Sequence, residues 1–226
     1  ILILYIISSF LMLFLPKAEV EVLESETNLE ILLKGWKLVA RDSRLRLFVS
    51  ANLLEIFSNT IWVSSIILVF VTELLNKTES YWGYSNTAYS IGIIISGLIA
   101  FRLSEKFLAA KWESILFPLV AMAIVTLTIL YFPNAQMFLL FSALVGMLSQ
   151  LKEVPESVFL QETVEENNLV NVYSVLEVIS TLAFSVFVLL MSYITESFGI
   201  SISFWLSAIC LMIEAILIYI RRDYFR

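Results

Sequence analysis

Polar side chains recur at helical spacing inside an apolar stretch that follows a strongly basic segment. Asn52, Glu55, Asn59 and Trp62 are separated by three, four and three residues, which places them on one face of a helix. Inserting a carboxylate into the membrane within an apolar helix costs a few kcal/mol of free energy, so we expect such a group to have a binding partner or a functional role. We expect the flanking asparagine amides to bond Glu55, and we interpret its carboxyl as a candidate for gaining and losing a proton.

Three further apolar stretches carry small or polar residues along one face. These residues are Tyr89 and Ser96 in the second, Gly146, Ser149 and Gln150 in the fourth, and Ser174, Glu177 and Thr181 in the fifth. We predict that they line a polar pathway together with the first stripe, Glu177 being a second candidate proton carrier. The alternative is that small residues only allow close helix packing. The stretches 113–132 and 200–220 have weaker stripes, so we expect them at the periphery.

Other residue types restrict the chemistry further. The sequence has no histidine and one cysteine, Cys210, which excludes an intrachain disulfide, histidine-ligated metals and Ser-His or Cys-His catalysis. No Gly-x-x-x-x-Gly-Lys phosphate loop occurs. We therefore expect no enzyme, no cofactor and no metal site, although an intramembrane enzyme remains a formal alternative.

The composition requires a membrane. Of 226 residues, 60% are hydrophobic and 15% are charged, and the mean hydropathy is +0.91. Soluble domains are about half apolar and a quarter charged. Spanning helices need about 20 mostly apolar residues, and the sequence offers six such spans, at roughly 47–72, 83–101, 113–132, 136–155, 169–194 and 200–220. The predicted fold class is all-α, a polytopic membrane helix bundle.

The chain divides into three parts. Residues 1–15 are apolar and end at Pro16, and we expect them to be the end of a truncated transmembrane helix. Residues 16–46 form a charged segment, acidic first and basic after, which we predict to be a central cytoplasmic loop. Residues 47–226 form the predicted six-helix transmembrane domain.

The basic residues indicate the topology. If 16–46 is cytoplasmic, twelve of the fourteen Lys and Arg residues lie on the cytoplasmic side; the exceptions are Lys77, outside, and Lys152, near an inner helix end. We therefore predict a multi-pass protein of the cell membrane, plasma or bacterial inner, with a cytoplasmic C-terminus. The basic run at 34–46 could instead bind nucleic acid, but the asymmetry continues along the chain, so we expect no nucleic acid partner.

LLKGWKLVARDSRLRLF resembles the end of the central loop and the start of helix seven in the major facilitator superfamily, and most closely in its drug, macrolide and siderophore exporter branch. YWGYSNTAYSIGIIISGLIAFRLSEKF resembles helix eight and the loop after it, and VPESVFLQETV with NVYSVLEVI resembles helices ten and eleven. The family's Gly-x-x-x-Asp-Arg-x-Gly-Arg-Arg-like loop element is interrupted here by Ser104, Glu105 and Phe107.

The resemblance implies a function and partners. It implies a secondary active transporter, a multidrug-resistance type antiporter for proton-coupled efflux of small amphipathic molecules, in which this chain is the C-terminal half. The striped residues would form the substrate and proton pathway, and Gly97, Arg102 and Lys106 a gating loop. The expected partners are the lipid bilayer, an N-terminal transmembrane half, a small-molecule substrate and protons. The alternative is a membrane scaffold or sensor that is related to transporters but does not transport.

Overall fold

The computed structural model describes residues 28–109 and 111–225, with Phe10 and Phe14, and every element in this part is helical. The elements are α2 (Asn28–Arg41), α3 (Ser43–Asn59), η1 (Thr60–Trp62), α4 (Ser64–Val69), η2 (Phe70–Leu74), α5 (Ser80–Ala109), α6 (Lys111–Tyr131), α7 (Ala135–Thr163), α8 (Glu166–Phe198), α9 (Ile200–Ile220) and η3 (Arg222–Phe225). This confirms the predicted all-α bundle. The prediction of a helix end at 1–15 lies outside the described residues, apart from Phe10 and Phe14.

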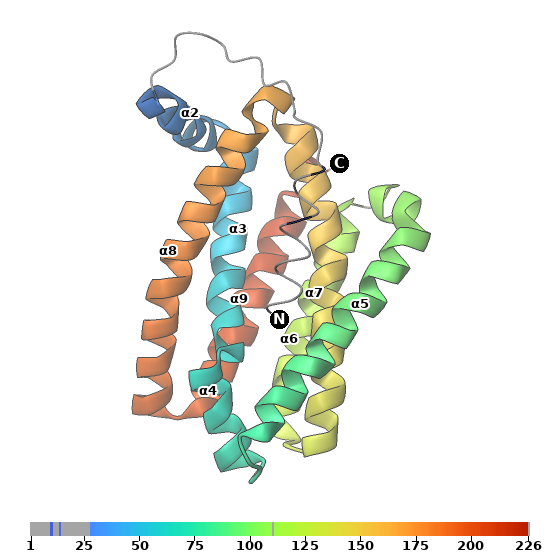
Figure 1. Ribbon diagram of the computed structural model, residues 1–226, viewed down its shortest axis with the longest axis vertical. Coiled ribbons are helices and arrows are strands. Elements are labelled where there is room, and N and C mark those ends of the chain that lie inside the picture. Colours follow the sequence, from blue (N-terminus) through green and yellow to red (C-terminus); the bar gives the residue numbers. More distant parts are fainter. Residues whose placement is uncertain (1–9, 11–13, 15–27, 110, 226) are drawn as a thin grey trace.

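Five described helices, α5 to α9, are long and apolar enough to cross a membrane. A sixth span results if α3 with η1 and α4 with η2 count as one, bent by 42° between Trp62 and Ser65. Val63 adopts an extended conformation at this break, and the Thr60 hydroxyl bonds the carbonyl oxygen of Phe57 just before it. The long helices run side by side and connect at alternating ends (Figure 1).

The predicted gating loop is helical. α5 continues to Ala109, so Gly97, Arg102 and Lys106 all lie within one helix, and the expectation of a loop there is wrong. The physical reason lies in the sequence RLSEKFLA, which contains neither a glycine nor a proline to end the helix and consists mostly of good helix formers. Gly97 and Arg102 are exposed on α5.

The bundle interior is built around α6 and α9. About half of the apolar window of α6 (50%) and of α9 (44%) is buried, compared with 11% for α8. Phe70 stacks on Phe204 of α9, with ring centroids 4.9 Å apart. The expectation that residues 113–132 and 200–220 are peripheral is therefore wrong, because each of these helices packs one face against other helices of this chain.

The corner between α2 and α3 is fixed by charged side chains. Asp42 caps α3 by accepting a hydrogen bond from the backbone N–H of Arg44 at 2.7 Å, and Arg46 donates from Nη1 to the carbonyl oxygens of Ala40 and Arg41. Partial burial raises the pKa of the Asp42 carboxyl, but the hydrogen bonds and charge of Arg44 outweigh burial and lower this pKa below its usual value. As a result, α2 lies across the end of the bundle instead of continuing α3 (Figure 1).

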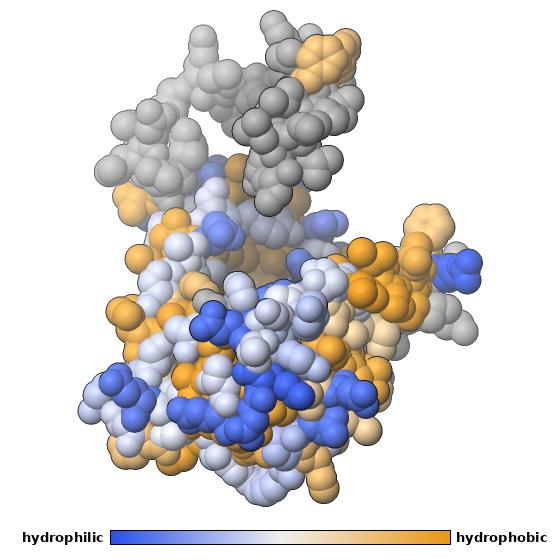
Figure 2. All heavy atoms as spheres, turned by 60° about the horizontal axis from the view of Figure 1, so that its bottom comes forward, coloured by the Kyte–Doolittle hydropathy of each residue, from blue (hydrophilic) through white to orange (hydrophobic). Residues whose placement is uncertain are grey.

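The surface of the bundle fits a bilayer. Hydrophilic residues gather over the end that carries the 75–79 and 132–134 connections, and apolar residues lie along the sides (Figure 2). The sides carry large exposed apolar residues such as Leu98, Phe117 and Leu189. In water, molecules with such an apolar surface would associate with one another, whereas in a membrane this surface contacts lipid acyl chains.

Two glycines let α5 and α7 approach backbone to backbone. A Cβ at Gly92 would collide with the carbonyl oxygen of Ala143, and one at Gly146 with that of Tyr89. Gly97, on the same helix as Gly92, has nothing within 4 Å of such a Cβ.

We therefore predict that Gly92→Ala lowers the free energy of unfolding by about 1–3 kcal/mol, because the two helices must separate. Gly97→Ala is the matched control and should be neutral or stabilising by up to about 1 kcal/mol. Denaturant unfolding in mixed micelles, followed by circular dichroism, measures both. Equal unfolding free energies for the two variants would contradict the close packing of α5 on α7.

Candidate functional site

A lysine lies among three carboxylates inside the bundle. The ammonium of Lys152 on α7 is 2.7 Å from Glu55 Oε2 on α3, 2.6 Å from Glu156 Oε1 one turn further along α7, and 3.8 Å from Glu214 Oε1 on α9. The side chains of Lys152 and Glu214 are 1% and 0% exposed, those of Glu55 and Glu156 12% and 16%. These four residues are called the Lys152 cluster below.

Neighbouring polar contacts hold the helices in the register that the cluster needs. The hydroxyls of Ser58 on α3 and Ser207 on α9 are 2.6 Å apart, and Ser207 also donates to the Ser58 carbonyl oxygen. Ser58 lies one turn from Glu55, and Ser207 lies two turns from Glu214. The serine pair therefore fixes α3 against α9 close to the carboxylates that both helices contribute.

The charges of the Lys152 cluster do not balance. With every group ionised, three carboxylates and one ammonium carry a net charge of −2. Both carboxyl oxygens of Glu214 are buried without a hydrogen-bond partner in the described part of the chain. Uncompensated charge in a low-dielectric interior costs several kcal/mol per ion. The Lys152 ammonium alone therefore does not balance the negative charge that these carboxylates bring into the interior.

The same carboxylates could in principle bind a metal ion. One oxygen from each of Glu55, Glu156 and Glu214 lies within 4.8 Å of the others. The Lys152 ammonium already stands among these oxygens and donates to two of them. The arrangement is thus that of a cation tethered to α7 among the three carboxylates.

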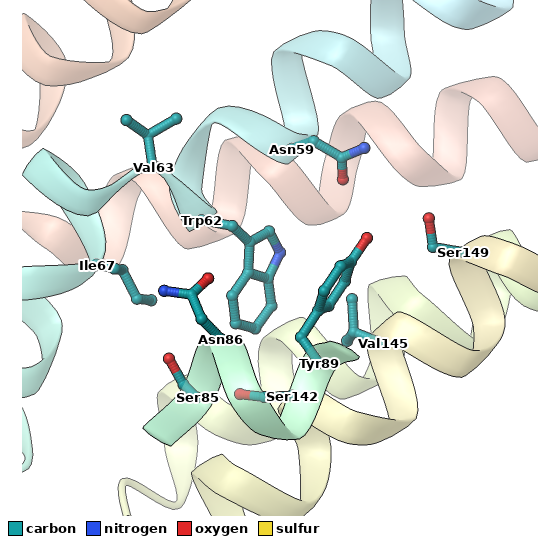
Figure 3. Close-up of a pocket in the computed structure, with 10 residues that line it drawn as sticks. All are labelled: Asn59, Trp62, Val63, Ile67, Ser85, Asn86, Tyr89, Ser142, Val145 and Ser149. Carbon is teal, nitrogen blue, oxygen red and sulfur yellow. The ribbon is translucent and has the colours of Figure 1, made fainter. Parts of the chain in front are cut away.

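Two adjoining cavities lead to the cluster. The first, about 260 Å³, is lined by Asn59, Trp62, Val63, Ile67, Ser85, Asn86, Tyr89, Ser142, Val145 and Ser149. Figure 3 shows Trp62 lying between Asn86 and Tyr89 in this cavity. The second, about 240 Å³, is lined by Asn52, Glu55, Ile56, Asn59, Ser149, Lys152, Glu153 and Glu156. Asn59 and Ser149 line both, so an aromatic cavity borders directly on a charged one.

Half of the predicted pathway residues meet at these cavities. They are Asn52, Glu55, Asn59, Trp62, Tyr89 and Ser149. The expectation that flanking amides bond Glu55 is wrong, because Lys152 reaches its carboxylate from α7. The side-chain oxygen of Asn52, Oδ1, instead accepts a hydrogen bond from the Ser180 hydroxyl of α8 at 3.1 Å.

The other predicted residues lie elsewhere. Ser174, Glu177 and Thr181 are exposed on α8, away from the cavity linings, and Glu177 is not part of the Lys152 cluster. Gly146 is a helix-packing residue, and the hydroxyl of Ser96 is buried without a partner among the described residues. Gln150 is half-buried and lines neither cavity.

Sequence reasoning missed Lys152 and Glu156 and gave little weight to Glu214. A signal was present. Lys152 and Glu156 are spaced i, i+4 within a span that is otherwise mostly apolar, and Glu214 is the single charged residue between positions 200 and 220. Charged residues in a membrane helix face the interior and pair with one another. Treating Lys152 as a residue near a helix end concealed this pairing.

We predict that Lys152→Met lowers the free energy of unfolding by about 3–5 kcal/mol near neutral pH, because it leaves the buried carboxylates without their counter-ion. The loss should shrink as the pH falls, since protons then neutralise the carboxylates. Lys77→Met, at an exposed lysine, should change stability by less than about 0.5 kcal/mol. Denaturant titrations in micelles at several pH values measure this, and a loss independent of pH would contradict the charge imbalance.

Comparison with known proteins identifies the family. The model of the Major Facilitator Superfamily matches residues 48–226. The uncharacterized MFS-type transporter YfmI of Bacillus subtilis (strain 168) is 27% identical over 185 residues, which cover 82% of this chain and 46% of the relative. The uncharacterized MFS-type transporter YjbB of the same organism is 29% identical over 167 residues, covering 74% and 41%. No solved structure matches.

The chain thus spans a little under half the length of these two relatives. The family match extends over α3 to α9, the elements that form the cavities and the Lys152 cluster. The chain belongs to the major facilitator superfamily.

Proposed function

We propose that this chain forms the C-terminal half of a secondary active transporter that exports small amphipathic molecules in exchange for protons. The proposal extends to the drug, macrolide and siderophore exporter branch that the sequence resembles. One observation carries it: the Lys152 cluster, with its unbalanced buried charge, adjoins a cavity lined by the aromatic side chains of Trp62 and Tyr89.

The exposed face of α8 supports the presence of a second half. Ser174, Glu177, Thr181 and Ser185 form a polar stripe on this helix and are all exposed. Polar residues of a membrane helix avoid lipid. A second bundle packed on this face would cover them and supply the opposite wall of the cavity. Alternating access would then be a rocking of the two halves around that cavity.

Glu55 is the residue best placed to link a proton to this motion. Its carboxylate lines the charged cavity and lies on a different helix from Lys152, whereas Glu156 shares α7 with Lys152 and Glu214 is fully buried outside the lining of this cavity. The ion pair between Glu55 and Lys152 connects α3 to α7, two helices that line both cavities. A proton on Glu55 weakens this connection and leaves Lys152 to Glu156 and Glu214. Proton binding thereby loosens one wall of the cavity from another.

The aromatic cavity suggests the chemistry of the substrate. Trp62, Tyr89 and Ile67 offer apolar surface, and Asn59 and Asn86 offer a few hydrogen-bonding groups. Sites of this kind hold a mostly apolar molecule and orient it with a small number of polar contacts. We infer a small amphipathic substrate that lies between the aromatic rings and points its polar end toward the charged cavity.

We predict that Glu55→Gln folds like the wild type but abolishes acceleration of export by a proton gradient. Glutamine keeps an oxygen that can accept from Lys152 but cannot be ionised. Export by the complete protein in proteoliposomes, with and without an imposed pH gradient, measures the effect. Glu196→Gln is the control, since Glu196 is exposed on α8 and lies outside both cavities. If Glu55→Gln exports with unchanged pH dependence, Glu55 does not couple protons to transport; if the wild type exports nothing in any gradient, a non-transporting role is favoured.

We also predict the orientation in the membrane. In a Cys210→Ala background, Lys77→Cys should react with a membrane-impermeant maleimide in right-side-out vesicles, because the basic ends of the other loops stay in the cytoplasm. Asp223→Cys, at the opposite end of the bundle, should react only in inside-out vesicles. The reverse pattern would overturn the proposed topology.

A further inference from the structure

α2 presents an exposed surface that the bundle does not use. Leu33, Trp36 and Ala40 follow one another at three and four residues and form an exposed apolar strip, with Leu33 and Trp36 each 44% exposed. Lys37 and Arg41 are both exposed on the adjoining strip of the same helix. At 100° per residue the two strips lie side by side along α2. One edge of the exposed surface is therefore apolar and the other is basic.

The opposite side of α2 is docked firmly on α8. Gly35 lies so close to α8 that a Cβ there would be 2.5 Å from the Asn171 carbonyl oxygen and 2.8 Å from Val175 Cγ2. Val39, one turn further along, is 7% exposed. Together with the Asp42 and Arg46 contacts at the corner, this holds α2 across the end of the bundle (Figure 1). The amphipathic surface thus has a fixed place at the end of the membrane-spanning helices.

We propose that α2 is an interfacial anchor that binds anionic phospholipids. A helix at the level where the spans end, with an apolar strip containing a tryptophan beside a basic strip, has the pattern of helices that lie in the headgroup region. Leu33, Trp36 and Ala40 would enter the boundary between headgroups and acyl chains. Lys37 and Arg41 would contact lipid phosphates, which complement their charge.

The charge around α2 selects the anionic lipid over a zwitterionic one. Arg44 and Arg46 lie at the same corner, and Asp42, which pairs with Arg44, is the acidic residue nearest to them in sequence. Each basic residue near an anionic membrane surface contributes about 1 kcal/mol to binding, and 1.4 kcal/mol is a factor of ten. Lys37 and Arg41 together correspond to a preference of about thirtyfold at low ionic strength, reduced by added salt.

Fluorescence quenching in the complete protein tests this. A fluorophore is attached to Ala40→Cys in a Cys210→Ala background, and the protein is placed in nanodiscs of phosphatidylcholine and phosphatidylglycerol at three to one. Spin-labelled phosphatidylglycerol should quench the fluorophore at roughly ten to thirty times lower content than spin-labelled phosphatidylcholine. The preference should fall to about equal in Lys37→Gln/Arg41→Gln.

One control variant and the emission spectrum separate the possible occupants of this surface. Arg221→Gln/Arg222→Gln removes two charges near the C-terminus and should leave the preference intact. Quenching by neither lipid, with a solvent-exposed emission spectrum, would mean that α2 lies in water. An apolar emission spectrum without quenching would mean that protein covers α2. Equal quenching by both lipids in the wild type would mean that no anionic lipid is selected. Each of these three results overturns the proposal, and none depends on whether the protein transports or on its orientation.

Discussion

The structure depends on the attraction between one ammonium and three carboxylates in a low-dielectric interior. Lys152 connects α3, α7 and α9 through charges that would be intolerable alone. Such a cluster specifies which helices meet and in which register, since a shift of one turn would leave a buried charge unpaired. The Ser58–Ser207 pair and the aromatic contacts of Phe70 support that register with weaker, less specific interactions.

The Lys152 cluster and the two cavities are built from the same helices. α3 and α7 supply both the Lys152–Glu55 ion pair and the walls of the aromatic cavity, so a change in the pair acts directly on the shape of the cavity. α5 is coupled to any movement of α7 because the backbones of the two helices are in close contact at Gly92 and Gly146. α8 is the least buried of the five spans α5 to α9 and carries its polar stripe outward, as the proposed contact with a second half requires.

Much of the fold could be predicted because a helix that crosses a bilayer must be a long apolar segment, which is visible in the sequence. Six spans follow from apolar length alone, although the bend in the first does not, and the stripe on α3 and η1 identified four of the residues that line the cavities: Asn52, Glu55, Asn59 and Trp62. What the sequence concealed was contact between helices far apart in the chain. Glu55 and Lys152 are separated by 97 residues, and nothing local to either indicates the other. The helical continuation of α5 was missed for a different reason: a family pattern suggested a loop, whereas RLSEKFLA favours a helix.

The unbroken length of α5 has a mechanical consequence. Its 30 residues extend about 45 Å, while the hydrocarbon core of a bilayer is about 30 Å thick. The apolar part ends at Arg102, so the remaining two turns continue the same rod into the headgroup layer. When the membrane-embedded part of a rigid rod tilts, its protruding tip sweeps sideways. If α5 tilts together with α7 around the cavity, the end of α5 that precedes α6 is displaced sideways at the membrane surface. The thickness of the surrounding bilayer favours some tilt angles of α5 over others.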